Sequence, residues 1–234
     1  MRILGLVTAR GGSKGFPGKN LAELGGIPLV QRSHALLASF RQMHPETRLF
    51  LSTDSPAIAA AWPEADRPTR FRPAHLSDDQ STSLDVVRFE LEAADREGFV
   101  AEGVLLVQPT SPLLELEDLE SAWRCMEQGA PCAVGMVELD HPIQWVWNRG
   151  ADGCLYQTFG QSEATRRQDL FSVYRPVGFY FSRREFLLQH GSFFVDGATQ
   201  CVPVPAERGI DIDHPRDLWM AEGILRHLSG KEHQ

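Results

Sequence analysis

The sequence lacks the features that tie a protein to a membrane, a structural metal or an oxidising compartment. It has four cysteines in 234 residues and no C-x-x-C pair. This usage argues against a structural zinc site and is typical of free thiols in a reducing compartment. The apolar run from Met1 to Ala9 is too short to span a membrane and carries no signal-peptide cleavage pattern. We therefore expect a soluble cytoplasmic protein with no membrane partner.

The chain also lacks an excess of positive charge. Lys and Arg number 23 and Asp and Glu number 31, which gives a formal net charge of -8. An acidic chain repels phosphate backbones, so general nucleic-acid binding is not expected. A polyanionic ligand would need a local cluster of cations that works against the overall charge. There is no internal repeat, and the length suits a single domain over residues 1–234.

Short apolar runs alternate with helical patterns along most of the chain. The apolar runs predict strands at Ile3–Thr8, Arg48–Ser52, Val104–Val107 and Ala133–Val137. Helical spacing predicts helices over Leu29–Phe40, from a capping box at Thr82 and Asp85, from Leu116 to near Gly129, and after Pro215. This alternation predicts an α/β fold of three layers, with helices on both faces of a mostly parallel sheet.

The stretch from about residue 140 to 181 breaks this alternation, and we expect it to be an inserted arm. It is rich in aromatic residues and has few helical signals. Its aromatic side chains either pack against a second subunit or complete the core of this one, and the sequence favours neither. They are Trp145, Trp147, Tyr156, Phe159, Phe171 and Tyr174.

A glycine-rich segment, Ala9 to Asn20, follows the first predicted strand. Its glycines allow backbone N–H groups to approach an anion, and Arg10, Lys14 and Lys19 add three positive charges. The Walker pattern fails because Ser13 stands where its first glycine belongs, and the dinucleotide fingerprint Gly-x-Gly-x-x-Gly fails as well. The segment therefore predicts a triphosphate site of another type.

Two aspartates alternate with isoleucines near the C-terminus, in Ile210-Asp211-Ile212-Asp213. In an extended strand both isoleucines can enter the core while both carboxylates face one pocket. Two such carboxylates suit Mg²⁺, which prefers oxygen ligands and bridges phosphates. The alternative is that Asp213 caps the helix that begins at Pro215 and Asp211 is solvated.

Taken together, the glycine-rich segment and several shorter motifs resemble the acylneuraminate cytidylyltransferases, the CMP-sialic acid synthetases. The resemblance runs over nearly the whole chain and keeps the order of the motifs. The shorter motifs are Ser52-Thr53-Asp54, Arg72-Pro73-Ala74, Gln108 to Leu113, Arg167-Gln168-Asp169, Tyr174-Arg175-Pro176 and Ile210 to Asp213.

The resemblance implies a Rossmann-like nucleotidyltransferase fold with a dimerisation arm and a Mg²⁺-dependent reaction. CMP would pass from CTP to the anomeric hydroxyl of an acidic nonulosonate, with release of pyrophosphate. It implies that Arg10, Lys19, Asp211 and Asp213 are catalytic and that the two aspartates bind Mg²⁺. The nucleotide would be held by Arg10, Gly11, Gly12, Lys14, Lys19, Asn20, Arg72 and Ser83.

The resemblance also implies a sugar pocket and a homodimer in which an aromatic pair reaches the neighbouring subunit. From the sequence without this resemblance, Gln108 could equally form hydrogen bonds within its own turn, and Phe193 and Phe194 could equally be core residues. The implied sugar-binding residues are Gln108, Arg167, Gln168, Arg175, Phe193 and Phe194.

Val177 departs from the family pattern, which usually has Asn after Arg-Pro. This change removes a polar group near the expected sugar pocket and leaves the sugar open among sialate, legionaminate, pseudaminate and the eight-carbon 3-deoxy-octulosonate. The enzyme for the eight-carbon sugar has a loop resembling Ser-Thr-Arg-Leu-Pro-Gly-Lys-Pro, which is less similar to the segment from Ser13 to Asn20. Transfer from GTP and a noncatalytic nucleotide-binding paralogue are further alternatives, and no residue is assigned as the general base.

Overall fold

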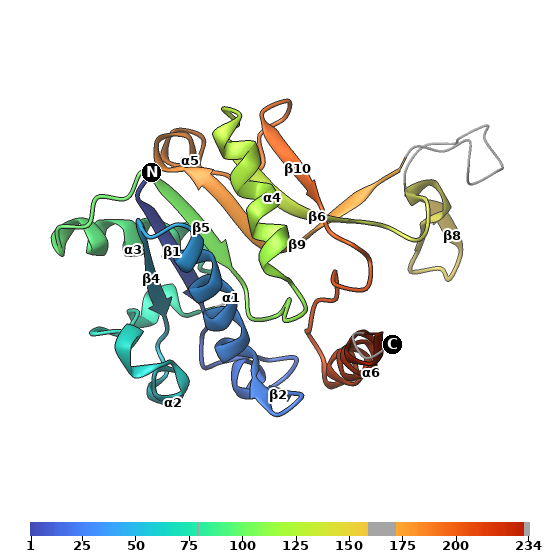
Figure 1. Cartoon of the computed structure of the whole chain (residues 1–234). Helices are drawn as coiled ribbons and strands as arrows, with labels where there is room; N and C mark the ends of the chain where they lie inside the picture. Colours follow the sequence, from blue (N-terminus) through green and yellow to red (C-terminus); the bar gives the residue numbers. More distant parts are fainter. Residues whose placement is uncertain (79, 159–171, 232–234) are drawn as a thin grey trace.

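A six-stranded sheet, in the order β10-β6-β9-β5-β1-β4, forms the centre of the computed structural model (Figure 1). The structure describes residues 1–78, 80–158 and 172–231. Within the sheet β9 is antiparallel to both of its neighbours, and the other pairs are parallel. The expected mostly parallel sheet is confirmed. Its strands are β1 (Ile3–Thr8), β4 (Thr47–Ser52), β5 (Gly103–Val107), β6 (Cys132–Glu138), β9 (Tyr174–Arg183) and β10 (Thr199–Pro203).

Helices cover both faces of the sheet (Figure 1). One core cluster joins the sheet to α1 (Leu29–Met43), α2 (Pro56–Ala61) and α4 (Leu116–Glu127). The other joins it to α3 (Ser83–Arg96) and α5 (Arg184–His190). Because both faces are covered, all five residues of β5 are buried, which explains why that strand reads as a continuous apolar run.

The last helix, α6 (Pro215–Lys231), lies apart from the sheet and belongs to a third apolar cluster. There Ala221 packs with Leu24, Leu29 and Ile212. Leu24 belongs to a short hairpin, β2 (Glu23–Leu24) and β3 (Ile27–Pro28). The sequence did not predict this hairpin, which separates the glycine-rich segment from α1.

Local signals marked the ends of several elements correctly. At the start of α3, Thr82 Oγ1 accepts a hydrogen bond from the N–H of Asp85 at 3.2 Å, and Asp85 Oδ2 accepts one from the N–H of Thr82 at 3.0 Å. The predicted capping box is therefore present. Short 3-10 turns connect other elements, at Lys19–Leu21, Glu64–Asp66, Ala74–Leu76 and Ile143–Trp145.

The arm is a hairpin of β7 (Trp147–Arg149) and β8 (Leu155–Gln157) that projects from the sheet (Figure 1). The predicted boundary at residue 181 lies too far along, because β9 begins at Tyr174 and enters the sheet between β5 and β6. Pro176 and Gly178 obscured that strand in the sequence. Four of the six arm aromatics are exposed by 42% or more and so do not complete the core, namely Trp145, Trp147, Tyr156 and Tyr174; Phe159 and Phe171 lie outside the described residues.

All four cysteines are free thiols, as expected. Burial raises the pKa of Cys132 to about 11, so this thiol stays protonated and unreactive at neutral pH. Within the part of the chain that the structure describes, no helix combines the length and the apolarity that a membrane span needs.

Candidate active site

A cavity of about 500 Å³ opens at the carboxyl edge of the sheet, where β1 and β5 end. From β1 the chain passes to β4 on one side and then returns to β5 on the other. Open α/β sheets bind ligands at this kind of switch point, because the loops diverge there and leave a crevice. Eight of the expected site residues line the cavity: Arg10, Lys14, Lys19, Asn20, Arg72, Ser83, Gln108 and Asp213.

The walls of the cavity carry the local positive charge that the acidic chain needs for a polyanionic ligand. Arg10, Lys14 and Lys19 reach it from the glycine-rich segment, and Arg72 reaches it from the loop before α3. Arg10 Nη1 donates to the carbonyl of Asp78 at 2.9 Å, which ties these two segments together.

Arg72 is buried, with 7% of its surface exposed. Its N–H donates to Thr53 O at 2.8 Å and its Nε to Ser77 Oγ at 3.2 Å, while its Nη2 finds no partner among the described residues. Burial lowers the pKa of Arg72, the carboxylates of Asp54 and Glu90 act the other way, and the guanidinium remains charged. A buried donor without an acceptor is costly, so a ligand atom at this point would relieve that cost.

The glycine-rich segment shapes the cavity more than it lines it. Buried Asn20 donates through Nδ2 to Arg10 O at 2.9 Å, which closes the segment on itself. Gly11 donates its N–H to Asp54 Oδ1 at 2.8 Å. Neither Gly11 nor Gly12 belongs to the cavity wall, so their expected nucleotide contacts stay a prediction. Gly18, at φ 73°, provides the left-handed residue from which the turn carrying Lys19 begins.

The N-terminus of α3 closes another side of the cavity, and this contribution was only partly predicted. Thr82, Ser83 and Val86, all from the start of the helix, line the wall. The N-terminus of a helix carries partial positive charge, so it favours an anionic ligand. The helix that follows the glycine-rich segment in sequence, α1, lies beyond the β2–β3 hairpin and is absent from the lining.

The Ile210–Asp213 segment runs beside the cavity as a connecting segment and not as the expected strand. Within it, Ile212 N donates to Thr110 O at 2.8 Å. Ile212 is buried and both aspartates are exposed, as the alternation predicted. Asp213 Oδ1 lies 2.9 Å from Lys19 Nζ, whereas Asp211 is not part of the cavity wall.

Asp217, and not Asp213, holds the start of α6. Its Oδ2 accepts hydrogen bonds from the backbone N–H groups of Asp213 at 3.0 Å and His214 at 2.7 Å. The capping alternative for Asp213 is therefore wrong. The Asp213 carboxylate stays directed at Lys19 in the cavity wall.

The residues expected at the sugar end are less concentrated than those at the nucleotide end. Gln108 lines the cavity, and its N–H donates to Gly178 O at 2.7 Å. Arg175 lies outside the lining, and its Nη2 donates to Gly209 O at 2.6 Å. Arg175 therefore supports the loop at Gly209, and its expected sugar contact stays a prediction. Arg167 and Gln168 lie outside the described residues.

The expected aromatic pair divides between two environments. Phe193 is buried in the core cluster of α3 and α5, whereas Phe194 is 49% exposed. Both rings pack against Tyr180 of β9, with ring centroids 5.2 and 6.1 Å away. Burial, and secondarily the charge of Asp211, raises the pKa of Tyr180, which places this ring close to the aspartate segment.

Val177 does not line the cavity. Its side chain is 1% exposed and lies in the core cluster on the α1 and α4 face. The expectation that its departure from Asn bears on the choice of sugar is therefore not supported by its position. It bears instead on packing beneath β9.

Sequence reasoning missed several residues at the site. His214 lines the cavity, and its Cε1 would lie 3.2 Å from a Cβ added at Gly15. Its position directly after Asp213 was the available signal. Tyr180 of β9, whose pKa is raised by burial and by the charge of Asp211, gave no signal, because its place near Asp211 depends on contacts between distant parts of the chain.

The carboxylates of Asp211 and Asp213 suit a Mg²⁺ ion that takes its other oxygen ligands from a bound phosphate group and from water. Among the described residues no group of three His, Cys, Asp or Glu could hold a metal. Mg²⁺ commonly uses one or two carboxylates together with phosphate oxygens and waters. Asp211 and Asp213 are two exposed carboxylates at this edge, one of them in the cavity wall, and they match that donor set.

The fold and the cation-lined cavity are those of a Rossmann-like nucleotidyltransferase. The chain belongs to the cytidylyltransferase family, whose model matches residues 4–195. Among solved structures, it is similar to a CMP:2-keto-3-deoxy-manno-octonic acid synthetase complexed with CTP, at a TM-score of 0.70 and 16% identity over 97% of this chain and 99% of the other. It is also similar to 4-diphosphocytidyl-2C-methyl-D-erythritol synthase from Anaerococcus prevotii, at a TM-score of 0.64 and 14% identity over 96% and 98%.

Curated relatives are closer in sequence. The chain is 30% identical to an N-acylneuraminate cytidylyltransferase of Streptococcus agalactiae over 96% of its length, and it spans 54% of that protein. It is 26% identical to a pseudaminic acid cytidylyltransferase of Campylobacter jejuni, with 97% of each chain covered. It is 26% identical to a CMP-N,N'-diacetyllegionaminic acid synthase of Legionella pneumophila, with 96% of this chain and 97% of the other covered.

Proposed function

We propose that this protein transfers CMP from CTP to the anomeric hydroxyl of an acidic keto-sugar of the sialic acid type and releases pyrophosphate. The observation that carries the proposal is the cavity into which Arg10, Lys14, Lys19 and Arg72 converge at the carboxyl edge of the sheet. The family match and the relatives that use acidic nonulosonates support it.

In the proposed reaction, the anomeric oxygen attacks the α-phosphorus of CTP. A new P–O bond forms, the bond to the β-phosphate oxygen breaks, and pyrophosphate leaves. The hydroxyl proton passes to solvent or to a base that remains to be assigned. Lys19 and Arg10 hold the phosphates and stabilise the charge that grows on them, which is where preorganised cations contribute most.

We propose that Asp211 and Asp213 hold Mg²⁺ when CTP binds. The ion would screen the charge of the triphosphate. In the structure Asp213 already contacts Lys19 at 2.9 Å, so the carboxylate and the phosphate-binding cation share one place in the cavity. We further propose that the protein is cytoplasmic and forms a homodimer, and the exposed aromatic arm supports the dimer.

The finer choice of sugar rests on the similarity to relatives with different substrates. Sialate, pseudaminate and legionaminate enzymes match this chain at 25–30% identity. We propose N-acetylneuraminate as the first substrate to test. The alternatives are legionaminate, pseudaminate or the eight-carbon acid, and transfer from GTP.

The test is pyrophosphate release with Mg²⁺ from CTP or GTP, each combined with the four sugars. We expect release with CTP and at least one nonulosonate, and loss of release in Asp211→Ala. Glu64→Ala is the matched control, because Glu64 is an exposed carboxylate that does not line the cavity. If the protein binds CTP but none of the nucleotide and sugar combinations yields pyrophosphate, the proposal is contradicted and a noncatalytic nucleotide-binding protein is favoured.

A further inference from the structure

The loop between β10 and the aspartate segment is tied to α4 by Arg208. Its Nη2 lies 2.6 Å from Asp118 Oδ1, its Nε donates to Asp118 Oδ2 at 3.2 Å, and its Nη1 lies 3.0 Å from Glu115 Oε2. A guanidinium that bonds one carboxylate through two nitrogens is fixed in direction as well as distance. The contact joins positions 90 residues apart in the chain.

The anchor on α4 is rigid. Asp118 is 3% exposed and its Oδ2 also accepts the N–H of Glu115 at 2.8 Å, within the capping box that begins the helix. Arg208 is therefore bound to a carboxylate that cannot move without disturbing α4. Only Gly209 and Ile210 separate Arg208 from Asp211.

Two further contacts hold the same short stretch of backbone. Arg175 of β9 donates to Gly209 O at 2.6 Å. A Cβ added at Gly209 would lie 2.7 Å from Val137 Cγ2, so this residue packs closely on β6. Ile212 N then donates to Thr110 O. The backbone is thus held on both sides of Asp211, at Gly209 by β6 and β9 and at Ile212 by the loop after β5.

We propose that Arg208 is a positioning residue, and that its contact with Asp118 sets where the Asp211 and Asp213 carboxylates stand and thereby their affinity for a divalent cation. The proposal deepens the proposed function and rests on it for turnover. Folding alone gives little reason for a buried ion pair, since an apolar pair of similar volume often stabilises a protein as well. Residues that hold metal ligands in place, by contrast, commonly matter for metal affinity.

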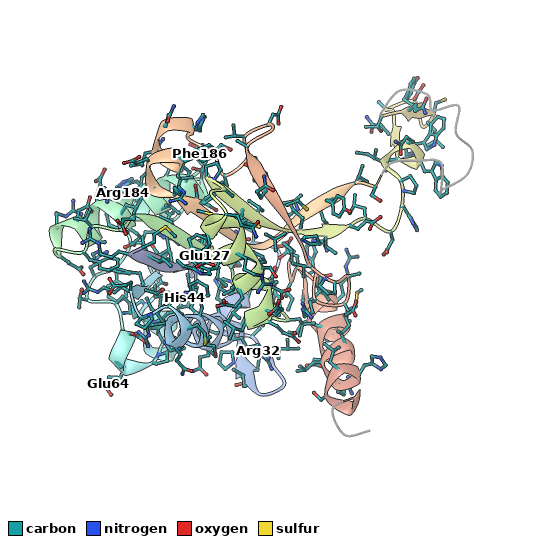
Figure 2. The ribbon with its side chains drawn as sticks, turned by 45° about the horizontal axis from the view of Figure 1, so that its top comes forward. Arg32, His44, Glu64, Glu127, Arg184 and Phe186 are labelled. Carbon is teal, nitrogen blue, oxygen red and sulfur yellow. The ribbon has the colours of Figure 1, made fainter. Side chains whose placement is uncertain are left out.

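The experiment compares Arg208→Ala and Arg208→Lys with Arg184→Ala as a matched control. Arg184 makes a similar two-nitrogen contact with Asp95, at 2.7 and 2.5 Å, and lies near Phe186 at the start of α5, far from α6 (Figure 2). The readouts are kcat and KM for CTP from pyrophosphate release, CTP binding without metal by calorimetry, and Mn²⁺ binding to the protein alone by electron paramagnetic resonance.

For Arg208→Ala we expect kcat and Mn²⁺ affinity each to fall by about 10–100-fold, while metal-free CTP binding stays unchanged. Arg208→Lys should recover part of the loss, because lysine keeps the charge but not the two-nitrogen geometry. Arg184→Ala should lose neither. Arg208→Ala combined with Asp118→Asn removes the unpaired buried carboxylate, so this variant should regain thermal stability without regaining Mn²⁺ affinity.

Equal behaviour of Arg208→Ala and Arg184→Ala in Mn²⁺ binding would overturn the positioning role. Recovery of Mn²⁺ affinity together with stability in the double variant would also overturn it, because the role would then be structural. If the unaltered protein releases no pyrophosphate from any pair, the proposed function fails, yet the Mn²⁺ measurement still decides the role of Arg208. Absence of Mn²⁺ binding by the unaltered protein would end this proposal alone.

Discussion

The nucleotide end and the sugar end of this molecule are built in different ways. The cations of the nucleotide end come mainly from one segment, Arg10 to Asn20, which directly follows β1. The expected sugar residues come from β9, from the loops after β5 and α5, and from residues outside the described ranges, and among the described ones only Gln108 lines the cavity. At the first end the sequence motif and the cavity wall largely coincide, and at the second end they separate.

This difference shows under which conditions a sequence motif locates the residues of a site correctly. A loop that leaves a central strand is placed by the strand itself, so its side chains reach the carboxyl edge of the sheet wherever the fold is kept. Arg175 and Phe193 had matching motifs as well. Their side chains are nevertheless used in holding Gly209 and filling the core, because packing around β9 decided their direction.

The largest expected effect tests the nucleotide end. Lys19→Ala should lower kcat for pyrophosphate release by about 10²–10³-fold, because one preorganised cation facing the phosphates is lost. Steady-state kinetics with CTP would measure it. Arg124→Ala is the control, since Arg124 is an exposed cation paired with Glu117 on α4. A kcat equal to that of the control would remove Lys19 from the catalytic set.

The next effect concerns stability beneath the sugar end. Val177→Asn should lower the free energy of unfolding by about 3 kcal/mol, because an amide would enter an apolar core without a partner. Chemical denaturation would measure it, with Val177→Ala as the control for lost volume alone. The order of preference among the four sugars should stay the same in both variants. A change of preferred sugar in Val177→Asn would restore this position to the sugar pocket.

A smaller effect should appear in sugar binding. Phe194→Ala should raise KM for the acidic sugar by about tenfold with little change in KM for CTP, because about 1.4 kcal/mol of contact is lost. Trp219→Ala is a matched control, since Trp219 is an exposed aromatic residue on α6. An equal rise in KM for CTP would mean that the two ends are not separate.

The smallest effect lies outside both ends, in the contact of Asp66 with α1. Burial raises the pKa of Asp66, but hydrogen bonds from Arg41 and His34 outweigh it and hold the pKa below its ordinary value. Because the pKa of Asp66 is lower in the folded state, its ionised carboxylate stabilises the fold at pH values above the unfolded pKa. This stability is lost as the pH falls below about 4.

Asp66→Asn should therefore unfold at a slightly lower temperature at neutral pH and show a flatter fall in stability below about pH 4. Thermal melts across pH would measure this. The unaltered protein is the reference, and pyrophosphate release should match it. A steeper acid-induced loss in the variant would show that the sign of the pKa shift is wrong.

Much of the fold could be predicted because each local signal has a local physical cause. The predicted strand Ile3–Thr8 matches β1, and the capping box of Thr82 marks the start of α3. The end of the arm could not be predicted, since β9 contains Pro176 and Gly178 and lies between two neighbours on the sheet. Its pattern therefore shows neither the alternation nor the unbroken apolar run of a typical strand.

What the sequence determined by itself is the order of elements, the cluster of cations after β1 and the pair of carboxylates before α6. These follow from periodicity and from charges that are adjacent in the chain. Only the tertiary structure decided that Asp213 stands beside Lys19, that Asp217 caps α6, and that Arg208 ties the aspartate segment to α4. Such contacts join positions far apart in sequence or depend on side-chain direction, and both are set by packing.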